Sequence, residues 1–198
     1  MIVSRSIALP RLLVAAFLSA ILLGAPPRNF ARGQTYDTFG TRTPLAPGET
    51  VILGFQGGRE RWDNERTGVG RLALALRGKN PPGVHVETVE NTKRPLAVEL
   101  VRRAFDRNQD GTLDDAERQS ARVILYGHSF GGAAVVKLAR ELEKIGIPVL
   151  LTVQIDSVGL GDILIPANVA RAANLYQRNG RIIHGEAEIR AADPDKTK

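Results

Sequence analysis

A serine lies between glycines in the segment GHSFGG, residues 127–132. Four apolar residues precede this segment and apolar residues at helical spacing follow it, so a buried strand should turn directly into a helix here. Such a turn can hold a serine hydroxyl rigidly outside the core if the residues two before and two after it are very small. Gly127 and Gly131 fill those places. The pattern predicts a nucleophile, Ser129, assisted by an oxyanion-binding amide, that of Phe130.

Two other uses of a glycine-rich turn compete with this interpretation. The glycines could serve only the close packing of a strand against a helix. A phosphate-binding loop is disfavoured, because Lys137 has neither the spacing from the glycines nor the adjacent Ser or Thr that such a loop requires.

In this setting the GHSFGG segment resembles the nucleophile elbow of the α/β-hydrolase superfamily, at its lipase and esterase end. The resemblance extends from about Val51 to about Ile189, although only the elbow is specific. It implies a serine hydrolase with a small ester or lipid as substrate. It also implies a second oxyanion-binding amide in a loop after an earlier strand. The segment GFQGG at 54–58 occupies that place, which assigns the amide to Phe55 or Gln56.

The resemblance further implies an acid and a histidine, in the chain order serine, acid, histidine. Asp156 ends the strand that follows the elbow helix and is the implied acid, with Asp162 as the alternative. An aspartate at this position could equally cap a helix or lie in a loop. His184 follows both aspartates and is the implied base, although its surroundings have strand character.

The two other histidines fit the role of base less well. His128 lies within the elbow, where its side chain should point away from the attack site, and His85 belongs to an early predicted strand. The family's histidine normally follows one further strand, for which the residues after His184 leave no room. Either His184 substitutes as the base, or the base is missing because the sequence is a fragment or a degenerate, non-catalytic relative.

A second chemical pattern occupies residues 106–117, DRNQDGTLDDAE. Oxygen-bearing groups recur there at the places that a calcium loop of the EF-hand type requires, and Gly111 would permit the sharp bend at the sixth place. The candidate ligands are Asp106, Asn108, Asp110, Thr112 through its carbonyl, Asp114 through a water, and Glu117 through both carboxylate oxygens. The resemblance to an EF-hand loop implies Ca²⁺ as a cofactor. A solvated acidic turn is the alternative.

The loop departs from the EF-hand pattern in two respects. EF-hand loops usually pair, and the sequence offers no second loop. The exiting helix can run only from Asp114 to about Ala121, because a strand is expected to begin at Val123. We therefore expect one weakly bound, structural Ca²⁺ that braces the segment leading to the Ser129 strand, and no organic cofactor. Exported proteins meet calcium at concentrations at which weak sites fill.

Predicted strands and helices alternate through most of the chain. Apolar runs bounded by turn residues predict strands at 51–55, 123–126 and 148–155, and an alternating segment between glycine and asparagine predicts a strand at 84–89. Helical spacing predicts helices at 69–76, 96–105 and 132–145, a short helix at 169–176, and then a last strand at 180–189. This alternation predicts an α/β fold with a mostly parallel sheet and helices on both faces. Compared with α/β-hydrolases, the fold should be incomplete at its C-terminus.

The first 33 residues have the character of an export signal. They contain four arginines and no acid, and residues 12–25 form an apolar run too short for a comfortable membrane span. The small residues Ala31 and Gly33, two apart, allow cleavage before Gln34, which predicts an exported protein, periplasmic or extracellular. The alternative is an uncleaved membrane anchor through residues 12–25. Residues 34–50 should form a linker and entry loop before a domain at 51–198.

Composition limits the remaining classes of function. A length of 198 residues with 43% hydrophobic and 24% charged residues suits one globular domain. The net charge of +6 falls to +2 without the four arginines of the leader, so nucleic acid is not an expected partner. The lack of cysteine excludes a thiol nucleophile and a cysteine-based zinc site.

Overall fold

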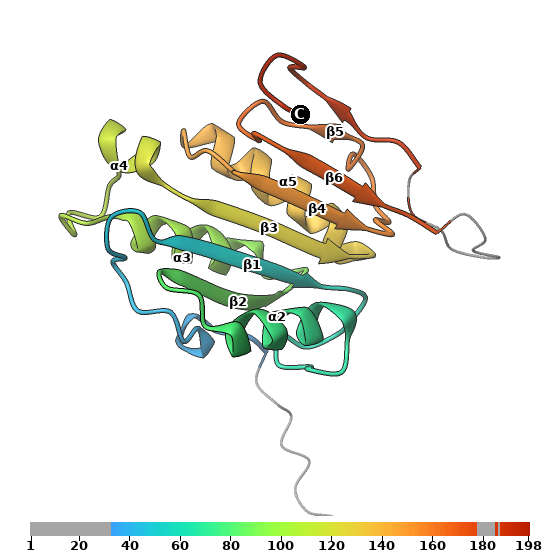
Figure 1. The fold of residues 1–198 in the computed structure, drawn as a ribbon, viewed down its shortest axis with the longest axis horizontal. Coiled ribbons are helices and arrows are strands. Elements are labelled where there is room, and N and C mark those ends of the chain that lie inside the picture. The colour runs from blue at the N-terminus through green and yellow to red at the C-terminus, as the bar shows by residue number, and fades with distance from the viewer. Residues whose placement is uncertain (1–32, 178–184, 186) are drawn as a thin grey trace, which may run out of the picture. The chain divides into compact units, whose positions relative to one another are not determined.

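A computed structural model of the chain describes residues 33–177, 185 and 187–198, and residues Gln34–Lys198 form one compact unit. The centre of this unit is a five-stranded parallel sheet in the order β2-β1-β3-β4-β6 (Figure 1). The strands are β1 (Thr50–Gln56), β2 (Val84–Glu90), β3 (Val123–His128), β4 (Leu151–Ile155) and β6 (Ala172–Leu175). The helices are η1 (Tyr36–Thr38), α2 (Gly68–Lys79), α3 (Arg94–Phe105), α4 (Asp115–Ser120) and α5 (Phe130–Lys144).

Helices lie on both faces of this sheet. Helices α3 and α5 pack together behind the sheet in Figure 1, while α2 lies in front of it and contacts β1, β2 and β3. The predicted α/β class, with a mostly parallel sheet between helices, is confirmed. Helix α2 connects β1 to β2, α3 and α4 connect β2 to β3, and α5 connects β3 to β4, so the chain returns to the same end of the sheet before each of these strands.

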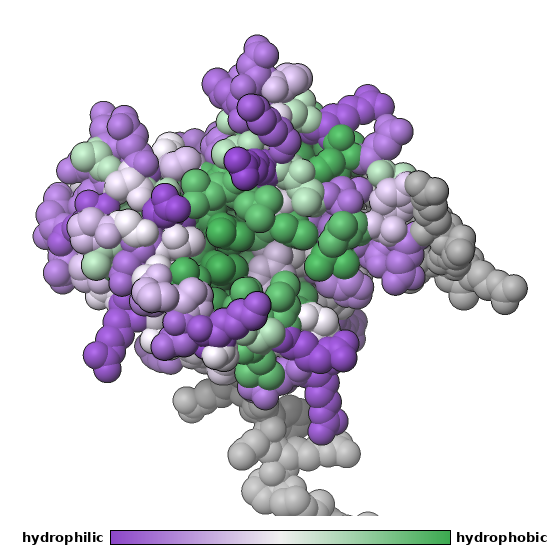
Figure 2. Space-filling view, in the orientation of Figure 1, coloured by the Kyte–Doolittle hydropathy of each residue, from purple (hydrophilic) through white to green (hydrophobic). Residues whose placement is uncertain are grey.

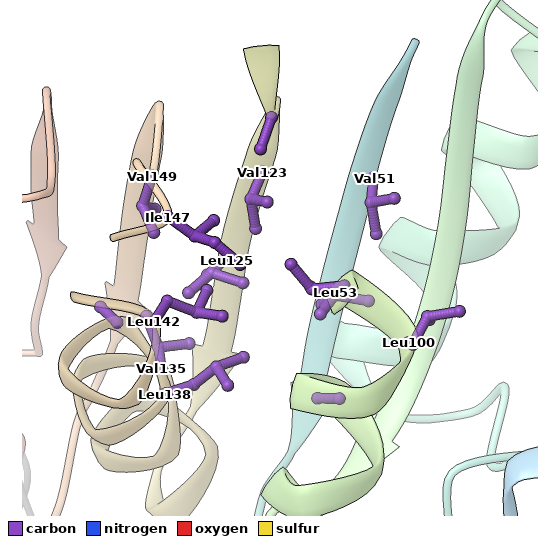
Figure 3. Close-up of a cluster of buried hydrophobic side chains, with 14 of the residues drawn as sticks. Val51, Leu53, Leu100, Val123, Leu125, Val135, Leu138, Leu142, Ile147 and Val149 are labelled. Atoms are coloured by element: carbon purple, nitrogen blue, oxygen red, sulfur yellow. The ribbon is translucent and has the colours of Figure 1, made fainter. Parts of the chain in front are cut away.

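The main core lies between the sheet and the α3–α5 layer (Figure 3). Alternate residues of the central strands point into it, among them Leu53 of β1 and Leu125 of β3, both fully buried. They meet Leu100 of α3 and Leu138 and Leu142 of α5, which are equally buried. Burying each such side chain stabilises the fold by roughly 1.5–3 kcal/mol. This core fixes β3 and α5, the two elements that flank Ser129.

The intervening residues of the same strands point to the other face, and several of them are only half-buried. They include Ile52, Ile124, Leu151, Val153 and Ile155. Figure 2 shows hydrophobic side chains gathered at the centre of this face. The sheet therefore has one fully packed face and one face that keeps apolar surface.

The segment before β1, predicted as a linker and entry loop, lies within the compact unit and packs against its strands and helices. Leu45 is buried and its N–H donates to the Ala104 carbonyl at 2.8 Å. The Glu87 carboxylate accepts from the N–H and the hydroxyl of Thr41 at 2.7 and 2.8 Å. The Gln34 side chain donates to the Thr88 carbonyl at 2.9 Å and accepts from the Glu90 N–H at 3.0 Å.

The C-terminal third of the chain differs from the predicted arrangement. The predicted short helix at 169–176 is wrong, because residues 172–175 form β6 and pair with β4 in parallel. A small two-stranded parallel sheet joins β5 (Leu164–Ile165) to β7 (Arg190–Ala191) and was not predicted. Most of the strand predicted at 180–189 lies outside the described residues. None of the helices in the described part of the chain is long and apolar enough to cross a membrane.

Candidate active site and calcium loop

Ser129 occupies the junction between β3 and α5 in a strained backbone conformation. Its φ is +56° and its ψ is −123°, a region that costs a residue with a side chain about 1–3 kcal/mol. The main chain holds it there, because its N–H donates to the Ile155 carbonyl at 3.0 Å and its carbonyl accepts from the Gly132 N–H at 2.9 Å. Ser129 is the N-cap residue of α5, but its side chain accepts no capping hydrogen bond. The hydroxyl is thus not used to cap the helix.

The glycines on either side of Ser129 leave no room for side chains. A Cβ on Gly127 would lie 2.3 Å from the Gly131 carbonyl oxygen, and a Cβ on Gly131 would lie 2.1 Å from that of Phe55. Both distances are far below ordinary contact, and the atoms met belong to the backbone, which cannot easily move aside. The strand and the helix therefore meet as closely as the spacing of the glycines predicts.

Two main-chain amides next to Ser129 have no acceptor among the described residues, those of Phe130 and Gly57. Phe130 is the first residue of α5, where N–H groups point out of the helix. Gly57 follows β1, and a Cβ on it would lie 3.3 Å from the Cβ of Ser129. Gly57 is not among the residues predicted from the sequence. One sequence feature could have indicated it: Gly57 directly follows strand β1, which is the neighbour of strand β3 in the sheet.

Phe55 and Gln56, the residues predicted for the second amide, end strand β1. Gln56 lines a cavity together with Ser129, and its side chain is fully buried. That side chain organises the loop after β1, because it donates to the Asn64 carbonyl at 3.2 Å and accepts from the Thr67 hydroxyl at 2.8 Å. The assignment of the second amide to Phe55 or Gln56 stays a prediction, and the structure adds Gly57 as a third candidate.

The cavity beside Ser129 has a volume of about 320 Å³. It is lined by Gln56, Gly57, Gly58, Glu60, Thr67, Gly68, Val69, His128 and Ser129. His128 was expected to point away from the attack site, but it is exposed and lines this cavity. Its Nδ1 atom lies 3.2 Å from the point at which Gly57 would carry a Cβ. Ser129 and the imidazole of His128 thus line the same pocket.

Asp156 lies at the end of β4, on the same edge of the sheet as Ser129. Its φ is +44°, its N–H donates to the Leu175 carbonyl at 2.7 Å, and its Oδ1 accepts from the Gln177 N–H at 2.6 Å. His184, the predicted base, lies outside the described residues. The next residue, Gly185, is buried against Asp156, since a Cβ on it would lie 2.5 Å from the Asp156 Cα.

Asp162, the alternative acid, is buried in the loop after β4. Its carboxylate accepts a short hydrogen bond from the Ser157 hydroxyl, and its carbonyl accepts from the Gln154 side chain at 3.0 Å. Ser157 in turn packs against Gly132 of α5. These contacts give Asp162 a structural role in fixing the loop behind the elbow.

The loop at 106–117 has a defined shape that the sequence anticipated in part. Gly111 has a φ of +85°, and its N–H donates to Asp106 Oδ2 at 3.0 Å. Hydrogen bonds from the side chain and backbone of Thr112 lower the pKa of Asp110, which favours its charged form. The predicted exiting helix is present as α4, with Asp114 as its N-cap. The loop and α4 precede β3, which begins at Val123, so the loop lies toward the opposite end of that strand from Ser129.

The donor set of the loop suits a hard cation only after a rearrangement. The Oδ1 atom of Asp106 is buried without a hydrogen-bond partner. A carboxylate oxygen that binds a cation would show this lack of a protein partner when the ion is not included. Both oxygens of Glu117 instead accept from main-chain N–H groups, of Arg107 at 2.9 Å and of Asp114 at 3.0 Å. Within the described ranges, no three Asp, Glu, His or Cys side chains converge as a metal site. Glu117 would have to turn toward the loop centre to bind a cation.

Comparison with known proteins does not assign the chain to a family. No family model matches it, and no curated protein matches it. The function proposed below therefore depends on the geometry of the turn at Ser129, the cavity beside it and the loop at 106–117.

Proposed function

We propose that this protein is an exported serine hydrolase of the α/β-hydrolase type that cleaves carboxylic esters. The observation that carries the proposal is the backbone of Ser129, held at a φ of +56° between two glycines that admit no side chain. A strained residue of this kind persists only where the surrounding structure imposes it, and a reactive group is the usual reason. A turn needed for packing alone would be satisfied by glycine at position 129.

In this proposal the Ser129 hydroxyl attacks the acyl carbon while a base takes its proton. The charge that develops on the carbonyl oxygen is stabilised by the Phe130 amide and by one amide from the end of β1, of Phe55, Gln56 or Gly57. The ester C–O bond then breaks and the alcohol leaves with the proton from the base. Water then attacks the acyl-serine while the base takes a proton from it. The bond between the acyl carbon and the Ser129 Oγ breaks, the carboxylic acid leaves, and the base returns the proton to the serine.

We propose His184 as the base and Asp156 as the group that orients it. The order of the three residues along the chain supports this assignment, as does the contact between Asp156 and Gly185, the neighbour of His184 in sequence. Asp156 also lies on the same edge of the sheet as Ser129. The N–H of Ser129 donates to the carbonyl of Ile155, the residue directly before Asp156.

We further propose that the loop at 106–117 binds one structural Ca²⁺. Asp106, Asn108, Asp110, the Thr112 carbonyl and Glu117 would hold the ion directly, and Asp114 would hold it through a water. The unpartnered Asp106 Oδ1 and the positive φ of Gly111 support this part of the proposal. When bound, the ion would supply positive charge that fixes the loop ahead of β3. It would have no part in the reaction at Ser129.

A non-catalytic calcium-binding protein is the second candidate. It is favoured by one observation: in the described part of the chain, no imidazole forms a hydrogen bond with the Ser129 hydroxyl. His85 is paired with Glu49 at 3.1 Å, at the start of β2 and far from the elbow in the sheet register. His128 lines the cavity without such a bond.

Hydrolysis of p-nitrophenyl butyrate by the full chain distinguishes the two candidates. Ser129→Ala and His184→Ala should each lower kcat by at least about 10³-fold, because a hydrolase without its nucleophile or base retains only oxyanion and binding effects. His85→Ala is the matched control and should retain wild-type activity. Turnover that survives Ser129→Ala would defeat the hydrolase proposal, and a complete lack of turnover in the wild type would favour the calcium-binding protein.

A further inference from the structure

The end of β4 and the loop after it, residues 156–162, hold both main-chain groups of Ser129. The N–H of Ser129 donates to the carbonyl of Ile155, the last residue of β4, at 3.0 Å. The carbonyl of Ser129 accepts from Gly132 in α5 at 2.9 Å and also from the N–H of Val158 in the loop at 3.2 Å. These bonds lie on either side of the strained φ of Ser129, so the loop at 156–162 limits how far this residue can relax.

A buried carboxylate joins the two ends of this loop. Asp162 is 1% exposed, and its carboxylate accepts a short hydrogen bond from the hydroxyl of Ser157, which is equally buried. The Asp162 carbonyl accepts from the side chain of Gln154 in β4 at 3.0 Å. The last residue of the loop is thus bonded to the strand before the loop and to the second residue of the loop.

The same loop lies directly against the first turn of α5. A Cβ on Gly132 would lie 2.7 Å from the Cβ of Ser157, and a Cβ on Gly159 would lie 2.4 Å from the Cβ of Ala133. The two glycines therefore let the loop and the helix touch without an intervening side chain. Because of this contact, a shift of the loop would also shift the start of α5, next to Ser129.

From these contacts we propose that Asp162 is a positioning residue for Ser129. Its carboxylate keeps the loop on the elbow, and the loop keeps Ser129 in the strained conformation. Without this carboxylate the Ser157 hydroxyl would be buried without an acceptor, and the loop would have to open to hydrate it. The bond from Val158 to Ser129 would then be lost, and a strained residue relaxes once its surroundings no longer hold it. The effect on reactivity rests on the proposed hydrolase function, whereas the effect on strain does not.

The first test compares the urea unfolding midpoints of Ser129→Gly and Ser129→Ala in the full chain. Glycine should be the more stable residue, because it tolerates a φ of +56°. In an Asp162→Ala or Ser157→Ala background this advantage should disappear, since an alanine at position 129 can then relax. Asn168→Ala is the matched control background, because the Asn168 side chain also donates to main-chain carbonyls, one near the middle of α5 and one after its end, both at 2.9 Å.

The advantage of glycine should persist in the Asn168→Ala background. The proposal is overturned if glycine keeps its full advantage in both the Asp162→Ala and the Ser157→Ala backgrounds. It is also overturned if glycine has no advantage in the otherwise unchanged chain.

The second test measures how fast an alkyl fluorophosphonate labels Ser129, by mass spectrometry, at a temperature at which circular dichroism shows every variant folded. In this reaction the serine oxygen bonds to phosphorus, fluoride leaves, and the hydroxyl proton passes to the base. Asp162→Ala and Ser157→Ala should slow labelling by about 10²-fold, the loss that a misplacement of about 1 Å can cause. Asp162→Asn keeps an acceptor for the Ser157 hydroxyl and should restore most of the rate. Asn168→Ala should be labelled at the wild-type rate.

An unchanged labelling rate in Asp162→Ala, or an equal loss in Asn168→Ala, would overturn the positioning role. Equal losses in Asp162→Asn and Asp162→Ala, with Ser157→Ala at the wild-type rate, would make Asp162 the catalytic acid instead. A wild type that is not labelled at all would defeat the hydrolase function alone, because the comparison of glycine with alanine at position 129 needs no activity.

Discussion

The Cα of Gly131 packs against the main-chain carbonyl of Phe55, so that a Cβ at position 131 would lie 2.1 Å from that oxygen. The contact joins the second residue of α5 to the end of β1, across strand β3. It sets how deeply the elbow helix enters the edge of the sheet. Both groups belong to the main chain, so no side-chain rearrangement can relieve an added methyl group.

Gly131→Ala should therefore destabilise the protein by about 3 kcal/mol, at the upper end of the usual cost of overpacking. The measurement is urea unfolding followed by circular dichroism. Gly78→Ala in α2 is the control, because a Cβ there meets nothing within 4 Å. The control should gain up to about 1 kcal/mol from its better helix propensity. Equal stability of the two variants would contradict the close contact between Gly131 and Phe55.

Ser129→Gly should be more stable than Ser129→Ala by about 1 kcal/mol. Glycine adopts a φ of +56° without the steric cost that alanine and serine share, and this relief exceeds the added freedom of the unfolded chain. Both variants lack the hydroxyl, so activity cannot account for the difference. Thermal unfolding of the pair measures it, and an alanine variant as stable as the glycine variant would show that position 129 is unstrained.

Calcium should raise the thermal stability of the protein in a manner that depends on Asp106. At a calcium concentration ten times the dissociation constant, binding to the folded state contributes about 1.4 kcal/mol. Asp106→Ala should remove the shift. Asp115→Ala is the control, because this exposed residue pairs with Arg118 and lies outside the proposed ligand set. A calorimetric titration with no heat at millimolar calcium would remove the calcium proposal.

Stability should fall as the pH rises from about 10 to about 12, in part through Tyr126. Burial raises the pKa of its phenol from 10.0 to about 12, while its hydroxyl donates to the Val69 carbonyl at 3.2 Å. Above pH 10 the unfolded chain loses this proton and the folded chain keeps it, so unfolding becomes easier by up to about 2 kcal/mol.

Denaturant unfolding between pH 9 and pH 12 measures this loss. Tyr126→Phe should be less stable near neutral pH, because it lacks the hydrogen bond, but its stability should fall less steeply above pH 10. Tyr176→Phe, at an exposed tyrosine, should follow the wild type. Parallel curves for Tyr126→Phe and the wild type would refute the assignment to Tyr126.

The local pattern of apolar residues predicted the central strands and helices well. It failed for β6, whose structure depends on hydrogen bonding to a distant strand. Strands β1, β3 and β4 coincide with predicted apolar runs, and β2 coincides with a predicted alternating segment. Burial in β4 runs against the apolar pattern, because Thr152 and Gln154 are buried while the three apolar residues of the strand are half-buried. Residues 172–175, Ala-Ala-Asn-Leu, carry no such pattern and form β6 only because the edge of β4 offers unpaired hydrogen-bonding groups. The glycine spacing around Ser129 was informative because the tight turn is a local requirement. The positions of Gly57 and Gly185 depend on contacts between distant segments, which spacing does not encode.

The side chain of Gln34 has a consequence for the behaviour of the protein at high concentration. It bonds the Thr88 carbonyl and the Glu90 N–H of β2, the outermost strand at one end of the sheet, and Arg77 bonds the Val86 carbonyl of the same strand at 2.9 Å. These are the groups that a strand from another molecule would use to extend the sheet. The side chains of Gln34 and Arg77 therefore occupy hydrogen-bonding groups of this edge strand. Removing both side chains would leave these groups unpaired and open to edge-to-edge pairing, which leads to aggregation.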